Sequence, residues 1–219
     1  MSYVIWIIAG AVALMVLLAL VRRLGRTAAT RQQVLEEVRR MLRGGLVENT
    51  PGRGPQARGR LGQLEITVDM HQDAKRTRQS PMWRVLAVGP VRIESPLEVR
   101  VDGWQGWIDP WMQLAETRGI SSGVGPTLEL HGDHLPELSH PVLMALRRQG
   151  PALGRGALYA RPDLMRAEIR CGSRPEENRP LFAYLQAMAE VSESTVNLTL
   201  GDRLQRLPRI RVESATPER

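Results

Sequence analysis

The chain has 219 residues, a formal net charge of +7 and one cysteine, Cys171. A single cysteine forms no intramolecular disulfide, which excludes a disulfide-stabilised scaffold and agrees with a reducing compartment. The sequence contains no glycine fingerprint for dinucleotides, no G-x-S-x-G elbow and no paired zinc cysteines, so the common enzyme classes that carry these motifs are not indicated. No cofactor is expected.

The first element in chain order is an apolar segment, YVIWIIAGAVALMVLLALV, over residues 3–21. It has no charge, amide or proline, and at about 1.5 Å per residue it spans roughly 28 Å, the thickness of a hydrocarbon core. Residues 1–22 are therefore predicted to form a transmembrane helix. A cleaved signal peptide fits poorly, because Arg22 and Arg23 stand where its small-residue cleavage site would lie.

No arginine precedes the apolar segment. Four follow it closely, namely Arg22, Arg23, Arg26 and Arg31. Since basic residues near a span resist translocation, the N-terminus is expected outside and the rest of the chain inside. The predicted location is the inner membrane of a bacterium, in a single pass, with a cytoplasmic domain.

The net charge is confined to the stretch after this segment. Residues 22–60 hold ten arginines and three glutamates, a net +7, whereas residues 61–219 hold twenty basic and twenty acidic residues. Juxtamembrane cations gain about 1 kcal/mol each from anionic headgroups, so lipid is the expected partner and nucleic acid is not. The predicted membrane-surface residues are Arg22, Arg23, Arg26, Arg39, Arg40 and Arg43.

Residues 23–43 are predicted to form a separate amphipathic helix. Thr30 and Gln33 have the spacing of a capping box, and apolar residues recur at helical steps up to Gly44-Gly45. This helix can pack on its own domain or on a second copy, lie on the membrane, or continue the anchor as a stalk. Residues 44–60 are rich in Gly, Pro and Arg and are interpreted as a flexible linker.

Residues 61–200 are predicted to form one cytoplasmic α+β domain, with a single antiparallel sheet and two or three packed helices. Apolar and polar residues alternate in several segments, as in half-buried strands, and 178–193 has an apolar helical stripe. The expected strands are 64–70, 83–88, 91–93, 97–101, 127–130, 156–160 and 164–170, with helices at 109–115, 141–149 and 178–193. Residues 201–219 are expected to be a polar tail.

This layout ends in a hairpin, GALYARPDLMRAEIRC, followed by an amphipathic helix. Over residues 61–195 it resembles uncharacterised single-pass, membrane-anchored α+β proteins of high-GC bacteria. The resemblance is one of layout and implies no particular activity or site.

The densest polar cluster is His131, Asp133 and His134, with His140 and His71 elsewhere in the sequence. Imidazole and carboxylate groups at this spacing can bind a divalent metal or supply a base with its orienting partner. The structural alternative is an ordinary Gly-Asp turn after a strand.

Three tryptophans, Trp104, Trp107 and Trp111, fall within eight residues. They are candidates for an aromatic contact surface or a membrane-resting foot, and the alternative is that they close one end of the core.

Cys171 is interpreted as a structural residue. The predicted function is a membrane-tethered interaction or scaffold domain that binds a protein partner or itself, and the alternative is a membrane-bound metal-dependent or hydrolytic enzyme using the histidine cluster.

Overall fold

The computed structural model describes residues 2–50, 54–71, 81–104, 116–120, 126–132, 140–172 and 174–206. These residues form an α+β fold built on one antiparallel sheet, as predicted. The expected helix at 109–115 and residues 207–219 of the expected tail lie outside the described part of the chain.

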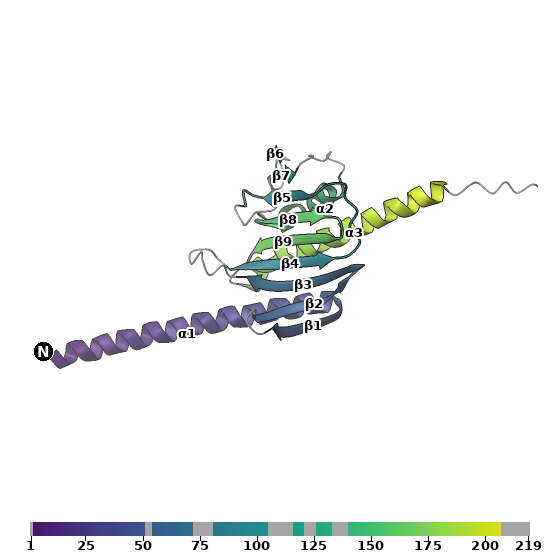
Figure 1. Ribbon diagram of the computed structural model, residues 1–219. Coiled ribbons are helices and arrows are strands. Elements are labelled where there is room, and N and C mark those ends of the chain that lie inside the picture. Colours follow the sequence, from purple (N-terminus) through teal and green to yellow (C-terminus); the bar gives the residue numbers. More distant parts are fainter. Residues whose placement is uncertain are drawn as a thin grey trace, which may run out of the picture.

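The sheet contains nine strands in the described ranges, in the order β1-β2-β3-β4-β9-β8-β5-β7-β6. Figure 1 shows them stacked in this order, with β1 and β6 as the two edges. Their bounds are β1 Arg43–Thr50, β2 Gly54–Leu61, β3 Leu64–His71, β4 Met82–Val88, β5 Leu97–Val101, β6 Glu116–Ile120, β7 Leu128–Gly132, β8 Gly156–Arg161 and β9 Leu164–Arg170.

Most expected strands are confirmed within a residue or two, because their alternation directs every second side chain towards the helices. In β3, for example, Leu64, Ile66 and Val68 are fully buried. Residues 91–93, expected as a strand, are an irregular connection whose Val91 and Ile93 side chains are nevertheless buried.

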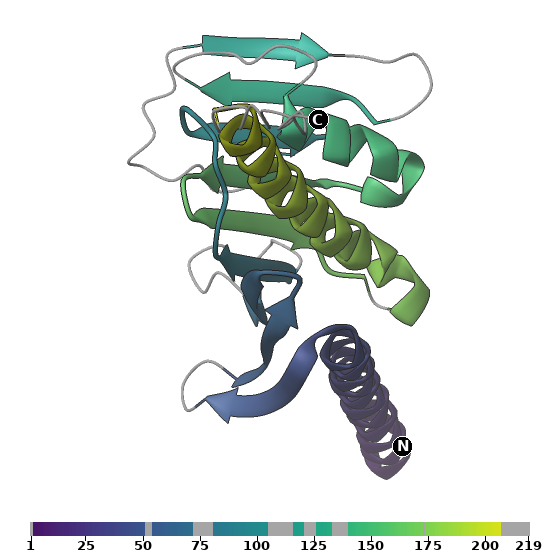
Figure 2. The ribbon, with the colours of Figure 1, turned by 90° about the vertical axis from the view of Figure 1, so that its right-hand side faces the viewer.

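The helices are α1 Ser2–Met41, α2 Pro141–Gln149 and α3 Arg179–Arg206, with short 3-10 turns at Gly150–Leu153 and Pro175–Asn178. Figure 2 shows α2 and α3 together on one face of the sheet. The predicted apolar stripe of α3 is confirmed, since Leu181, Leu185 and Met188 are fully buried in the core.

The first helix differs from the expected anchor followed by a separate helix. α1 is one unbroken helix of 40 residues, so the Thr30–Gln33 capping pattern lies inside a helix and starts none. Its C-terminal part packs into the core through Val34, Leu35 and Val38, while its N-terminal part extends away from the sheet (Figure 1). Of the placements open to residues 23–43, the structure shows packing on the chain's own domain, within a helix that continues from the preceding segment.

No helix in the described part of the chain is long and apolar enough to cross a membrane. Most side chains of the predicted span, those at 3–11, 13, 20 and 21, lie outside the description, as do the side chains of Arg22, Arg23 and Arg26.

The largest difference from expectation lies at residues 44–60, where the predicted flexible linker is a hairpin of β1 and β2. Residues 56–61 also pair with β3, from Gln56 opposite Asp69 to Leu61 opposite Leu64. Composition misleads here because small side chains permit close packing: a Cβ at Gly59 would lie 2.7 Å from Leu42 Cβ and 3.0 Å from Gly45 Cα. The domain therefore begins within α1.

This packing predicts the effect of Gly59→Val. The added side chain collides with the end of α1 and the facing strand, and overpacking of this kind lowers the free energy of unfolding by about 1–3 kcal/mol. Urea unfolding of the full chain, followed by circular dichroism, measures the change. Arg60→Val is the matched control, because Arg60 lies on the same strand, points to the other face and has a 67% exposed side chain. Equal stability of the two variants would mean that 44–60 is unstructured.

Candidate functional site

The sheet has one apolar face under the helices and one polar face, which we call the open face. The open face carries the side chains that alternate with the core positions, such as Glu65, Thr67 and Asp69 on β3. Many of these polar groups are nevertheless well covered. Asp69 is only 6% exposed and Glu98 only 5%, so their charges need partners.

Opposite charges stand in register across the central strands of the open face. Arg84 on β4 lies opposite Asp69 on β3 and opposite Glu168 on β9. Its guanidinium donates to both carboxylate oxygens of Asp69, from Nε at 3.0 Å and from Nη2 at 2.5 Å. Glu168 accepts a hydrogen bond from Arg166 on its own strand. The two hydrogen bonds from Arg84 to Asp69 fix the plane of the Arg84 guanidinium.

A second charged group lies further along the same face, on β5 and β7. Arg100 Nε donates to Glu98 at 2.7 Å, and Glu98 lies opposite His131. Burial and the nearby Arg100 lower the pKa of His131 despite the opposing effect of Glu98 and Glu129. The imidazole of His131 is therefore neutral at pH 7, beside the ion pair of Arg100 and Glu98.

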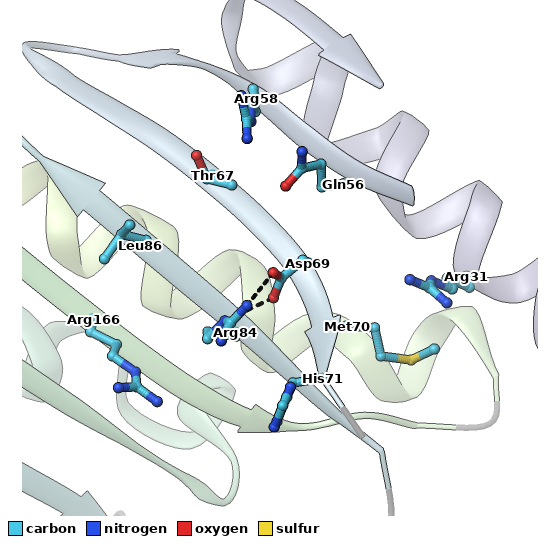
Figure 3. A pocket seen from close by; sticks show the side chains of 10 residues that line it. All are labelled: Arg31, Gln56, Arg58, Thr67, Asp69, Met70, His71, Arg84, Leu86 and Arg166. Atoms are coloured by element: carbon cyan, nitrogen blue, oxygen red, sulfur yellow. Dashed lines mark hydrogen bonds and ion pairs between the residues drawn. The ribbon is translucent and has the colours of Figure 1, made fainter. Parts of the chain in front are cut away.

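A cleft of about 700 Å³ lies over β2, β3 and β4 on this side (Figure 3). A volume of this size is typical of a small-molecule site. Four arginines line it against one aspartate, which gives it a cationic character. The lining residues are Arg31, Gln56, Arg58, Thr67, Asp69, Met70, His71, Arg84, Leu86 and Arg166.

Arg31 reaches the cleft from α1, on the far side from the arginines of the sheet (Figure 3). Its Nη2 donates to the backbone oxygen of Pro55 at 3.2 Å. Its Nε is buried and has no hydrogen-bond partner among the described residues. Burial lowers the pKa of Arg31, and the attraction of Asp69 and Cys171 opposes that shift. A guanidinium stays charged throughout the physiological pH range, so this side of the cleft has an unsatisfied donor.

The structure places the described histidines in separate elements. His131 lies on β7, His140 caps α2 by accepting from Val142 N at 3.3 Å, and His71 ends β3 in the cleft. Asp133 and His134 lie outside the described residues. Within the described ranges, no three acidic, histidine or cysteine side chains are arranged to hold a metal ion. The metal site at His131, Asp133 and His134 stays a prediction.

The aromatic cluster is described only at its first member. Trp104 is buried, and Trp107 and Trp111 lie outside the description, so a shared aromatic surface stays a prediction.

Among the predicted membrane-surface arginines of the described part, Arg39 pairs with Glu36 at 2.6 Å and Arg40 is exposed. Arg43, at the start of β1, is also exposed.

The cleft was not predicted from the sequence. Its arginines come from four elements, and the surrounding domain is neutral when charges are only counted. The available signal was the alternation itself, which places Thr67, Asp69 and Arg84 on the polar side of their strands. Alternation identifies the face but does not bring Arg31 to it.

No protein-family model, curated protein or solved structure matches this chain.

Cys171 lies behind the cleft, half-buried, with its Sγ 3.7 Å from Met70 Sδ. Burial raises the pKa of this thiol from 9.0 to about 11. The thiolate is the reactive form, so at pH 8 a disulfide reagent should modify the native chain about a hundredfold more slowly than the urea-unfolded chain. Absorbance of the released thiol measures both rates. A faster native reaction would contradict the structural interpretation of Cys171.

Proposed function

We propose that this chain is a non-enzymatic interaction domain that α1 tethers to the inner membrane of a bacterium, where the domain binds a protein partner on the cytoplasmic side. In this proposal, the single helix α1 forms the membrane tether with its N-terminal half and packs on the domain with its C-terminal half. The observation that carries it is the contrast between the two halves of α1.

The N-terminal half of α1 is apolar and uncovered. Five consecutive residues, Leu14 to Leu18, are each 50% to 69% exposed. Successive residues are about 100° apart on a helix, so five of them cover the whole circumference, and no face of this segment packs on the domain. A soluble protein rarely exposes so large an apolar surface, and a helix that is apolar all round suits a lipid environment.

The C-terminal half of α1 is the opposite case. Val34, Leu35 and Val38 are fully buried against the domain. No proline interrupts the helix between the two halves, so the membrane segment and the domain are joined without a hinge loop. Arg31 follows Val21 by ten residues, or about 15 Å along the axis, so in this proposal the cleft lies just beyond the headgroup layer.

This geometry narrows the expected belt of headgroup contacts. On a straight helix Arg39 lies about 27 Å beyond Val21, outside the headgroup layer and beyond a Debye length of about 8 Å. The proposed belt therefore consists of Arg22, Arg23 and Arg26 and leaves out the later arginines Arg39, Arg40 and Arg43.

The open face is the surface that the proposal assigns to the partner. Leu46, Leu86 and Val88 are 39% to 59% exposed there, between charged neighbours. Leu46 and Leu86 lie in one cross-strand row with Arg58 and Thr67 between them. Apolar side chains surrounded by polar groups are typical of a non-obligate protein interface.

The tether predicts the effect of a double substitution, Val12→Arg with Ala13→Arg, at the middle of the apolar segment 3–21. Two arginines at the centre of a span cost about 5–7 kcal/mol on the insertion scale, so the full chain should move from the carbonate-resistant membrane pellet to the soluble or aggregated fraction. Immunoblotting of the fractions measures this. Met144→Arg is the control, since Met144 is an exposed apolar residue on α2 and the variant should stay in the membrane pellet. A double variant that stays there would contradict the tether.

The partner surface predicts site-specific photocrosslinking in cells. A photoreactive side chain at Val88 should give a discrete adduct, because this position lies exposed on the open face, whereas the same side chain at Met144 should give none. Immunoblotting and mass spectrometry identify the adduct: a different protein supports the proposal, and twice the mass of this chain identifies a second copy instead. No adduct at Val88 or Leu46 would contradict a partner on this face.

A further inference from the structure

We infer that the cationic cleft between α1 and the open face is a binding site for a phosphate-bearing ligand with at least two negative charges. The proposed interaction function assigns no small ligand, so this inference stands or falls separately from the protein partner. It depends on the donors that remain free, on the surplus of charge and on the directions from which the guanidinium groups approach the cleft.

The first observation is the supply of hydrogen-bond donors. Arg31 has five N–H groups, and its bond to Pro55 oxygen uses one of them. Its Nε is buried without a partner in the described structure, which is costly unless a bound group satisfies it. Arg84 uses two of its five N–H groups on Asp69, which leaves three in a fixed plane.

The second observation is the charge that the cleft leaves unbalanced. Arg31, Arg58, Arg84 and Arg166 face one carboxylate, Asp69, in the lining. Two glutamates outside the lining lower this surplus, because Glu168 pairs with Arg166 and Glu48 lies 3.8 Å from Arg58. When Glu168 and Glu48 are both counted, the cleft still has one positive charge in excess. The contact between Glu48 and Arg58 is long and its side chains are half exposed, so a closer anion easily replaces Glu48 at Arg58.

The third observation concerns the shape of the ligand. Guanidinium groups bind phosphate in a planar, two-point manner, and here they approach from α1 on one side and from the sheet on the other (Figure 3). A single carboxylate offers one negative charge and one plane, whereas a phosphate monoester or a diphosphate presents oxygens in several directions. Asp69 accepts from Arg84 through both of its oxygens, so it does not compete with the ligand for the hydrogen-bond donors of Arg31.

Phosphate of this kind has two sources. It can belong to a soluble phosphorylated compound, or to a phosphomonoester lipid headgroup, since the cleft lies about 15 Å along α1 from the end of the apolar segment. The chemistry in the cleft is the same for both.

The test uses the full chain in nanodiscs of neutral lipid and measures pyrophosphate binding by calorimetry at constant ionic strength. The wild type should bind saturably, and Arg31→Gln and Arg58→Gln should each weaken binding by about tenfold or more, since each loses a charge-assisted hydrogen bond. Arg60→Gln is the matched control: Arg60 lies on the same strand and face as Arg58, pairs with Glu65 at 3.0 Å and does not line the cleft. It should bind like the wild type.

The outcomes are distinguishable. No saturable binding by the wild type, or equal losses in Arg60→Gln and Arg31→Gln, would overturn the site. Thermal unfolding without ligand shows whether each variant is folded, and Arg58→Gln, whose native side chain is half exposed, keeps the test valid if Arg31→Gln fails to fold.

Repeating the titration in nanodiscs that contain phosphatidate supports a lipid source if pyrophosphate affinity falls, and a soluble source if it is unchanged. Neither result depends on the photocrosslinked partner.

Discussion

The C-terminal half of α1 packs against the β1–β2 hairpin, and much of the remaining structure depends on this contact. Val34, Leu35 and Val38 are fully buried there, and Gly59 lets the end of the helix approach the strand closely. Neither partner is stable alone, because a two-stranded hairpin is marginal in water and a helix gains most of its stability from packing. Their contact orders β1 and β2, extends the sheet to β1, and sets the direction in which the apolar half of α1 leaves the domain.

The same contact decides what lies on the two faces of the sheet. The core face needs apolar side chains at every second position, so the polar residues of the strands collect on the open face. Several of them are almost fully covered, and a covered charge is tolerated only when it is paired. Asp69 with Arg84, and Glu98 with Arg100, meet that requirement. Arg31 forms no ion pair in the described structure and its Nε has no partner. Arg100 Nη2 also lacks a partner, but Arg31 differs because it lines an open cleft.

The periodicity of apolar residues predicted those strands and helices that carry a core face of their own. The strands around Leu64–Met70 and Leu97–Val101 and the helix at 141–149 follow from periodicity alone, since each has a core face of its own. Residues 44–60 have no such face, because Ala57 and Gly59 contribute little apolar area and become ordered only when α1 covers them. The cleft was beyond prediction for a related reason. Its charges come from α1, β2, β4 and β9, and charge counting along the chain cannot bring them together.

The anchor and the cleft share one helix, which links the two proposals physically. Arg31 lies between the exposed apolar segment that ends near Val21 and the buried residues that begin at Val34. A turn of about 100° separates neighbouring side chains on a helix, so rotating or sliding α1 by one residue removes Arg31 from the cleft and Val34 from the core at once. An anion held by Arg31 and by the arginines of the sheet therefore opposes such movements. Since ligand affinity and conformational preference are linked reciprocally, the two proposals together imply that forces on the proposed membrane segment that shift α1 also change the affinity of the proposed site.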